Sequence, residues 1–235
     1  MTAVKRSALV FGGSRGIGAA CVSALSADGW RVAYTYLNSA APASEQAYAA
    51  DMRDPAAVAA AFERAERSFG GALDAVVVNA GVNVPGAPLA SFSPENFRLL
   101  LEINLVGAFN VLAEAARRVA DGGAIIAVTT SLVRHAVPGA GPYTATKAAV
   151  ESLARSLAKE LAPRKVRVNC VAPGPVDTDL FNAGKTEEMK KRMAAMSPFD
   201  RIGRPEEVAK VVAFLASEDA SWVHGQIVQP NGGMV

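Results

Sequence analysis

Cysteine and histidine are scarce in this chain, whose 235 residues contain two of each. Two cysteines cannot form a disulfide framework, and Cys21 and Cys170 lack the paired spacing of a zinc site. We expect both to be buried, reduced thiols. His135 and His224 are isolated in the sequence, so a structural role is expected for each rather than a catalytic one. The sequence therefore predicts no metal site.

The chain also lacks a strong charge of either sign and a long hydrophobic run. Its 24 Lys and Arg against 22 Asp and Glu give a formal net charge of +2, and scattered basic residues argue against nucleic acid or an anionic membrane as a partner. The apolar stretch after Arg6 ends at Gly12, too early for a signal peptide, and no run approaches the roughly 18 residues of a membrane span. We therefore expect a cytoplasmic protein.

Short apolar segments alternate with helical ones along the chain. The segments at 8–11, 31–36, 75–78, 124–129, 166–171 and 226–228 are rich in Val, Ile and Ala without polar alternation. Strands of this kind are covered on both faces, which predicts a parallel sheet. Asp54-Pro55, Ser93-Pro94 and Arg204-Pro205 mark helix starts. The prediction is one doubly wound α/β domain over residues 1–235, with ligands beyond the carboxyl ends of the strands.

A glycine-rich turn follows the first predicted strand. Residues 12–18 read Gly-Gly-Ser-Arg-Gly-Ile-Gly and lead into a helix predicted over 19–28. In this G-x-x-x-G-x-G spacing, glycines allow a tight turn and a close approach of the backbone to a pyrophosphate at a helix N-terminus. The turn alone is weak evidence for a dinucleotide site, because a bare strand-to-helix turn has the same composition.

A phenol and an ammonium group lie on one predicted helix. Tyr143 and Lys147 are four residues apart on a helix predicted over 142–161, so they share a face. Ser131 follows the strand at 124–129 and precedes Tyr143 by twelve residues. A hydroxyl, a phenol and an ammonium are thus expected to converge beyond the strand ends.

Taken together, the motifs resemble those of the short-chain dehydrogenase/reductase family over nearly the whole chain. The markers, in the family's order, are Gly12–Gly18, Asp51, Asn79-Ala80-Gly81, Asn104, Ser131, Tyr143 with Lys147, and Pro173-Gly174 followed by Thr178. The resemblance implies a Rossmann fold and an oxidoreductase. It makes Tyr143 the proton donor, Ser131 the group that bonds the substrate oxygen, Lys147 a ribose ligand and Asn104 part of a proton relay through water.

The chemistry of carbonyl reduction explains these residue types. Hydride transfer to a carbonyl carbon leaves negative charge on oxygen, so a positioned acid must donate a proton. Lys147 and a positive nicotinamide ring would lower the phenol pKa of Tyr143 from its usual value near 10. Thr130 competes with Ser131 for the substrate oxygen, because the family's serine more often precedes the tyrosine by one residue more. We expect Ser131 to hold this position.

The end of the second strand indicates the cofactor. Proteins that prefer NAD place an acid there for the ribose hydroxyl, and the segment 33–39 contains none. Arg15 offers a guanidinium for a 2′-phosphate, and Asn38 and Ser39 add neutral donors. NADP(H) is therefore expected over NAD(H). The candidate cofactor-binding residues are Gly12, Ser14, Arg15, Gly16, Ile17, Gly18, Asn38, Ser39, Asp51, Asn79, Ala80, Gly81, Tyr143, Lys147, Pro173, Gly174, Val176 and Thr178.

Four features depart from the family. Phe11 replaces a threonine before the glycine turn, and the crossover to the third strand is shortened, so its helix is expected to be reduced to a turn. Arg134 replaces a glycine near the expected mouth of the substrate pocket, where it contacts an anionic substrate or points into water. Asn231 replaces an aspartate, without an evident functional meaning.

The substrate is expected beneath a lid at about residues 178–199, which carries adaptable apolar side chains and a basic run. The run could attract a carrier-bound acyl group, although it is equally typical of a solvated helix face. The sequence predicts an NADPH-dependent carbonyl reductase resembling the 3-oxoacyl-acyl-carrier-protein reductase branch. Its substrate would be a small-molecule ketone or a 3-oxoacyl group, and the reverse reaction would oxidise an alcohol. The alternative is a dinucleotide-binding sensor with vestigial catalysis. Two apolar helices, at 93–120 and 142–161, predict a homotetramer.

Overall fold

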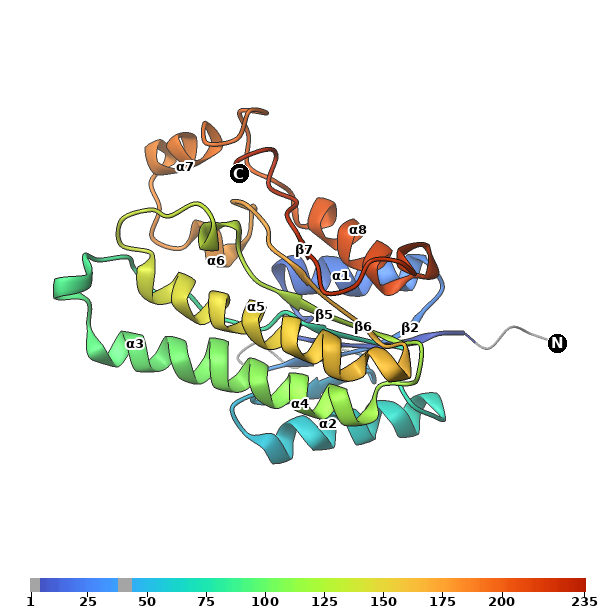
Figure 1. Cartoon of the computed structure of the whole chain (residues 1–235). Coiled ribbons are helices and arrows are strands. Elements are labelled where there is room, and N and C mark those ends of the chain that lie inside the picture. Colours follow the sequence, from blue (N-terminus) through green and yellow to red (C-terminus); the bar gives the residue numbers. More distant parts are fainter. Residues whose placement is uncertain (1–4, 38–43) are drawn as a thin grey trace.

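Seven parallel strands form the central sheet of the computed structural model, which describes residues 5–37 and 44–235 (Figure 1). The sheet order is β3-β2-β1-β4-β5-β6-β7. The strands are β1 (Ser7–Phe11), β2 (Arg31–Tyr36), β3 (Ala47–Ala49), β4 (Ala75–Val78), β5 (Ala124–Val128), β6 (Arg167–Val171) and β7 (Ile227–Val228). This arrangement confirms the predicted doubly wound parallel sheet.

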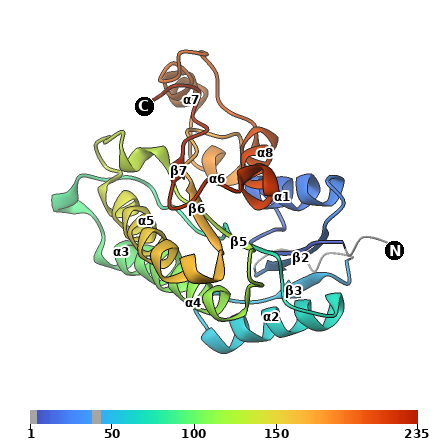
Figure 2. The ribbon, with the colours of Figure 1, turned by 45° about the vertical axis from the view of Figure 1, so that its right-hand side comes forward.

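Helices cover both faces of the sheet. They are α1 (Gly16–Ala27), α2 (Pro55–Phe69), α3 (Pro94–Leu100), α4 (Ala108–Arg118), α5 (Gly141–Leu161), α6 (Asp179–Asn182), α7 (Glu187–Ala194) and α8 (Pro205–Ala216). Figures 1 and 2 show α1 and α8 on one face, and α2, α4 and α5 on the other. Successive side chains of β1 serve the two layers in turn: Leu9 and Phe11 pack toward α2, while Ala8 and Val10 pack toward α1. Burial on both faces explains the apolar strands.

From β1 the chain adds strands first toward one edge of the sheet (β2, β3) and then, from β4 onward, toward the other edge. This switch of order between β1 and β4 creates a crevice at their carboxyl ends. β1 pairs with β2 on one side and with β4 on the other. In the connection from β2 to β3, residue 37 and residues 44–46 are described and none of them is helical. The predicted cofactor contacts Asn38 and Ser39 lie outside the described residues.

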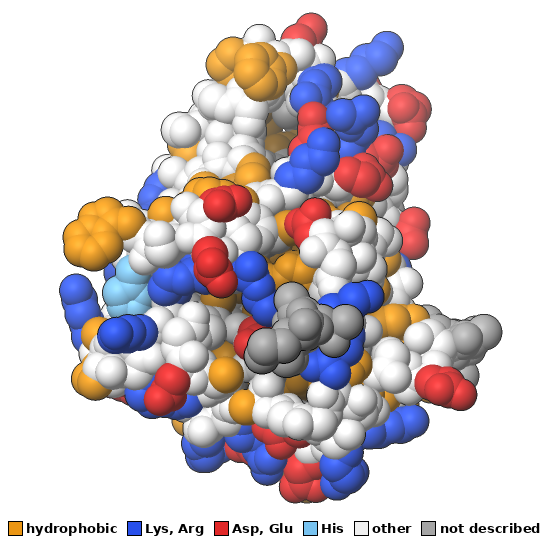
Figure 3. All heavy atoms as spheres, turned by 90° about the vertical axis from the view of Figure 1, so that its right-hand side faces the viewer, with side chains coloured by type: hydrophobic (Ala, Val, Ile, Leu, Met, Phe, Trp, Pro, Cys, Tyr) orange, Lys and Arg blue, Asp and Glu red, His pale blue; other side chains and the backbone are white. Residues whose placement is uncertain are grey.

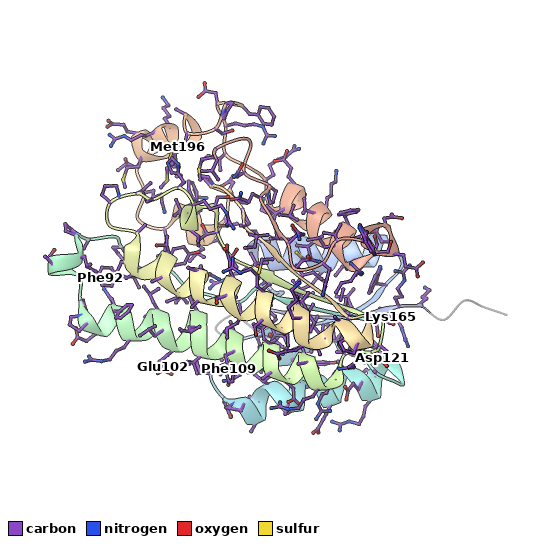
Figure 4. The ribbon with its side chains drawn as sticks, in the orientation of Figure 1. Phe92, Glu102, Phe109, Asp121, Lys165 and Met196 are labelled. Atoms are coloured by element: carbon purple, nitrogen blue, oxygen red, sulfur yellow. The ribbon has the colours of Figure 1, made fainter. Side chains whose placement is uncertain are left out.

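The helix Pro94–Arg118 runs through α3, a π-helical turn at Leu101–Gly107, and α4. By length and composition alone it could cross a membrane, with 25 residues and a mean hydropathy of 1.5. Its residues Val111 and Leu112 are nevertheless buried against the sheet, as in the core helix of a globular domain. Figure 4 shows Glu102 and Phe109 along the edge of this helix away from α5, and Phe109 is 52% exposed.

Charges of both signs share the molecular surface. Figure 3, which views the right-hand end of Figure 1, shows Lys and Arg side chains interspersed with Asp and Glu, and scattered hydrophobic groups. Some charges of the protein are paired: Arg118 on α4 contacts Glu66 on α2 at 2.9 Å and also contacts Glu114. On the face shown in Figure 3, the described residues thus form a surface of mixed positive and negative charge rather than a broad positive patch.

Candidate active site

A cleft opens at the crevice between β1 and β4. Its walls come from the glycine turn, the ends of β2 and β3, the segment after β4 and the start of α6. The lining residues are Gly12, Ser14, Arg15, Gly16, Ile17, Thr35, Tyr36, Leu37, Ala50, Asp51, Met52, Arg53, Asn79, Ala80, Gly81, Val82, Ile103, Thr178, Asp179 and Leu180. Ten of the predicted cofactor-binding residues therefore meet in one cleft, and Arg53 joins them without having been predicted.

The glycine turn is shaped to bring backbone close to a ligand. Gly12 has a φ of +79°, and its N–H donates to the hydroxyl of Thr35 at 3.0 Å. A β-carbon on Gly18 would lie 1.9 Å from the Gly12 carbonyl oxygen, so only glycine fits there. Thr35 supplies a hydroxyl to the turn although Phe11 cannot, because Phe11 packs in the core against Phe62.

Helix α1 begins directly at this turn. Arg15 precedes it with an extended backbone, and its side chain makes no capping hydrogen bond. The first N–H groups of α1 are then free for an anion, and the helix dipole favours negative charge there. The Asn79 side chain donates to the Gly12 carbonyl oxygen at 2.9 Å and ties β4 to the turn. This geometry suits a dinucleotide pyrophosphate.

Two arginines line the cleft, Arg15 at the glycine turn and Arg53 after β3. Arg15 is exposed, and Arg53 forms a bidentate pair with Asp51, with Nε to Oδ1 at 3.0 Å and Nη2 to Oδ2 at 2.5 Å. The hydrogen bond from Arg53 lowers the pKa of the Asp51 carboxyl. Of the two acids in the cleft lining, Asp51 is thus paired with a cation, whereas Asp179 belongs to the start of α6. The sequence signal for Arg53 was its position two residues after Asp51.

Lys147 and Asn104 lie directly behind the cleft wall at Gly81. A β-carbon on Gly81 would be 3.1 Å from Asn104 Oδ1 and 3.3 Å from Lys147 Nζ. Asn104 is fully buried in the π-helical turn, where it accepts from the Val82 N–H at 2.8 Å and donates to the Val82 carbonyl at 2.9 Å. Lys147 Nζ donates to the Val128 carbonyl at 3.0 Å. Asn104 therefore braces the wall, and π-helical turns often mark functional sites.

Tyr143 and Lys147 occupy one face of α5, as their spacing predicts. Burial raises the pKa of the Tyr143 phenol to about 12 and lowers the pKa of Lys147 to about 8. Burial is the cause of the Tyr143 shift. The lowering expected from Lys147 together with a nicotinamide ring therefore stays a prediction for the cofactor complex.

Three consecutive hydroxyls follow β5, and only one is uncommitted. Thr129 donates to Glu151 at 3.0 Å, and Ser131 donates to the Ala172 carbonyl at 2.6 Å. Thr130 only accepts, from the Leu132 N–H at 3.3 Å, and no acceptor for its own hydrogen is present among the described residues. Thr130 is 8% exposed, whereas Ser131 is completely buried.

This geometry favours Thr130 over Ser131 for the substrate contact. The Ser131 hydroxyl is completely buried and gives its hydrogen to the Ala172 carbonyl, so in this arrangement it has no hydrogen left for a substrate oxygen. Ser131 instead joins the strand ends, because its N–H also donates to the Pro173 carbonyl at 2.9 Å. Thr130, the competing candidate, has the free donor.

The remaining predicted residues support the cleft from outside it. Gly18, Pro173, Gly174 and Val176 do not line the cleft, and a β-carbon on Gly174 would lie 3.1 Å from Asn231. Tyr143 and Lys147 also lie outside the cleft lining.

Two side chains discussed from the sequence have structural partners, and two thiols are buried. Arg134 does not line the cleft. It is partly exposed to water and pairs with Glu151 at 3.2 Å. His224 accepts from the Val168 N–H at 3.2 Å and contacts the Ala158 carbonyl at 2.8 Å, as expected for a structural histidine. Both cysteines are buried, which raises the pKa of each thiol to about 12.

Comparison with known proteins agrees with this geometry. The family described as Enoyl-(Acyl carrier protein) reductase matches residues 12–235. The chain is 39% identical to the NADPH-dependent aldehyde reductase-like protein, chloroplastic, of Arabidopsis thaliana, covering 98% of the chain and 94% of that relative. It is also 39% identical to the 3-oxoacyl-[acyl-carrier-protein] reductase MabA of Mycobacterium tuberculosis, covering 98% and 93%.

A solved structure has the same fold. The structure of a short chain dehydrogenase from Burkholderia cenocepacia in complex with NADP superposes with a TM-score of 0.88 at 32% identity, covering 98% of both chains. Sequence, fold and cleft thus agree from the glycine turn to the C-terminal segment. The chain belongs to the short-chain dehydrogenase/reductase family of NAD(P)-dependent oxidoreductases.

Proposed function

We propose that the protein is an NADPH-dependent carbonyl reductase that acts on a ketone, an aldehyde or a 3-oxoacyl group. The observation that carries the proposal is the position of Lys147 behind the cleft wall at Gly81, where its ammonium bonds the Val128 carbonyl at the end of β5. Tyr143 shares its face of α5, and the free Thr130 hydroxyl follows β5 by two residues. The reduced nicotinamide would supply hydride. The relatives named for NADPH-dependent aldehyde reduction and 3-oxoacyl reduction support this reaction class.

Each side chain has a distinct task in this proposal. Tyr143 donates the proton, and because burial raises the pKa of its phenol, a bound cofactor would have to lower that pKa for efficient transfer. Thr130 donates a hydrogen bond to the substrate oxygen and fixes its orientation. Lys147 holds positive charge beside the phenol and bonds the ribose. Asn104 holds the wall at Val82, and its part in a proton relay stays a prediction.

The preference for NADPH over NADH rests on the charges at the adenosine end. The described end of β2 has no acid, Arg15 is exposed beside the glycine turn, and Arg53 neutralises Asp51. A 2′-phosphate would therefore meet a guanidinium, and Asp51 would not oppose it as an unpaired carboxylate. The Burkholderia neighbour contains NADP, which supports the same choice.

The segment 178–199 is proposed as the substrate lid. It forms α6 and α7 and projects from the carboxyl edge of the sheet (Figures 1 and 2). Leu180 lines the cleft, while Met189 and Phe199 are exposed by 44% and 69%. Met196 lies in the same projecting part (Figure 4). These apolar groups suit a hydrophobic substrate chain.

A carrier-bound acyl group is a second substrate class to test. The basic run on α7 is partly neutralised, because Lys190 pairs with Glu187 at 2.8 Å and Arg192 with Glu188 at 3.7 Å. The relative named as an acyl-carrier-protein reductase supports testing it.

Assembly into a homotetramer is part of the proposal. Phe97 and Phe109 on the α3–α4 helix are 38% and 52% exposed, although both are aromatic. Exposed aromatic groups on one helix are typical of a subunit interface. Light scattering at micromolar concentration should give four subunits, and a monomer would contradict this part.

The proposed function is tested by a panel of aldehydes, ketones, quinones and 3-oxoacyl thioesters, with NADPH and NADH, followed by the nicotinamide absorbance. Turnover with at least one carbonyl class and faster turnover with NADPH are expected. Tight cofactor binding without turnover of any carbonyl would instead indicate a dinucleotide-binding sensor.

A further inference from the structure

An ion pair between Glu151 and Arg134 lies beside the candidate active site, and the proposed reaction makes no use of it. Glu151 is the next residue after Tyr143 and Lys147 on the same face of α5, each step being four residues. Its side chain is only 3% exposed, whereas that of Arg134 is 37% exposed. Arg134 Nη1 lies 3.2 Å from Glu151 Oε2 and 3.4 Å from Oε1.

The same carboxylate binds a second residue of the segment after β5. Glu151 Oε1 accepts from the Thr129 hydroxyl at 3.0 Å. One buried side chain therefore holds the residue immediately before Thr130 and a residue four positions after it. The short 3-10 turn Ser131–Val133 lies between these two contacts. Thr130 sits in a loop that Glu151 closes.

Lys147 adds a third contact between α5 and this strand. Its Nζ donates to the Val128 carbonyl at 3.0 Å, two residues before Thr130. Successive turns of α5 thus hold Val128, through Lys147, and Thr129, through Glu151. A shift of Thr130 along or away from α5 would break at least one of these bonds. The helix that carries Tyr143 is in this way fixed to the strand end that carries Thr130.

The burial of Glu151 shows why the pair matters more for geometry than for stability. Removing a carboxylate from water is unfavourable, and a buried ion pair often gives no more stability than a well-packed apolar pair. Its advantage is a directional set of hydrogen bonds with one satisfied arrangement. The charge of Arg134 is used in this arrangement, so it is not free for an anionic substrate.

We propose that Glu151, held by Arg134, is a positioning residue that sets Thr130 relative to Tyr143. The inference rests on the proposed function, because it assigns the Thr130 hydroxyl to the substrate oxygen. A misplacement near 1 Å can cost about a hundredfold in rate, so even a modest shift of Thr130 should be visible in kcat.

The test uses the full-length protein with Arg134→Met, Arg134→Lys, Glu151→Gln and the Arg134→Met/Glu151→Gln double variant. Arg134→Met and Glu151→Gln should each lower kcat about tenfold or more, while the Kd for NADPH stays within about twofold, since the cleft lining is unchanged. Arg134→Lys keeps the charge and should recover most of the rate. The double variant should be no slower than Glu151→Gln, because Arg134 acts only through Glu151.

Arg155→Met is the matched control, since Arg155 is an exposed arginine one turn further along α5 and should leave kcat unchanged. A lower melting temperature of Arg134→Met with unchanged kcat would show a merely structural pair and overturn the inference. If Glu151→Gln does not fold, Arg134→Met and Arg134→Lys decide alone, because Arg134 is partly exposed. Loss of activity in Tyr143→Phe with normal Arg134→Met would reject this inference only, whereas an active Tyr143→Phe would reject the proposed function.

Discussion

The side-chain amide of Asn231 donates a hydrogen bond to the hydroxyl of Ser131 across 3.1 Å, and the two residues are 100 positions apart. Because Ser131 gives its only hydroxyl hydrogen to the Ala172 carbonyl, its oxygen can only accept a further bond. The Asn231 amide has an N–H that can donate to this oxygen, whereas an ionised carboxylate has no hydrogen to donate. Asn231 Oδ1 also accepts from the Gly233 N–H at 3.0 Å, which anchors the C-terminal segment.

Asn231→Asp should therefore destabilise the protein, although aspartate is the residue expected from the family resemblance. The variant would place a carboxylate oxygen against the acceptor oxygen of Ser131 at a site that is 8% exposed. Urea unfolding should show a loss of about 1–3 kcal/mol. In the Ser131→Ala background the same substitution should cost less, because the opposing oxygen is gone. Equal costs in both backgrounds would disprove the contact's role.

Thr130 and Ser131 should respond in opposite ways to loss of the hydroxyl. Thr130→Val keeps the shape and removes the free donor, so kcat should fall about 10²- to 10³-fold, while Thr130→Ser should keep most of the activity. Ser131→Ala should lower stability and leave kcat within about threefold, since this hydroxyl is bonded inside the protein. Steady-state kinetics and thermal unfolding of the three variants measure both effects. A large kcat loss confined to Ser131→Ala would return the substrate contact to Ser131.

The pH dependence of carbonyl reduction should follow Lys147. Its pKa of about 8 means that the ammonium is present below pH 8 and is lost as the pH rises through this value. The kcat/KM for reduction should therefore fall above about pH 8, because this ratio reports the free enzyme. The phenol of Tyr143, with a pKa of about 12, stays protonated throughout. A profile that is flat to pH 10 would contradict the role of the Lys147 charge.

Arg15→Ala should separate the two cofactors. A charge-assisted hydrogen bond to a 2′-phosphate contributes roughly 1.5–3 kcal/mol, so NADPH binding should weaken about ten- to a hundredfold and NADH binding hardly at all. Since Arg15 is exposed, added salt should weaken the wild-type preference. Fluorescence titration of both cofactors at two ionic strengths measures this. Equal wild-type affinities, or a parallel loss for both cofactors in Arg15→Ala, would show that the 2′-phosphate lies elsewhere.

Arg53→Met serves as the comparison for Arg15→Ala. Arg53 is held by Asp51 on the segment after β3 rather than at the glycine turn, so its loss should change the affinities for NADPH and NADH by similar factors. The same titrations apply. A selective loss of NADPH in Arg53→Met alone would identify Arg53 as the phosphate ligand instead.

The sequence was sufficient for features that depend on local spacing. Apolar strands without alternation predicted the parallel sheet, and the interval of four residues placed Tyr143 and Lys147 on one face of α5. The glycines at 12 and 18 predicted the turn because each must fit a backbone constraint that other residues violate.

Features that depend on distant partners were beyond the sequence. The choice between Thr130 and Ser131 is decided by Ala172 and Asn231, which other strands bring to the site. The pKa of Tyr143 depends on how much protein surrounds the ring, a property that the distance along the helix does not give. Arg134 pairs with Glu151, which lies seventeen positions further along the chain. No local spacing in the sequence indicates that these two residues form an ion pair.

Replacement of Tyr143 by phenylalanine is the most direct test of the proposed reaction. Tyr143→Phe removes one hydroxyl and should retain the fold and the affinity for NADPH, while the rate of NADPH oxidation by a carbonyl that the wild type reduces should fall about 10²- to 10⁴-fold. The measurement is the nicotinamide absorbance under saturating NADPH, with the Kd determined in parallel. A folded Tyr143→Phe variant that binds NADPH and turns over at nearly the wild-type rate would contradict the assignment of Tyr143 as the proton donor.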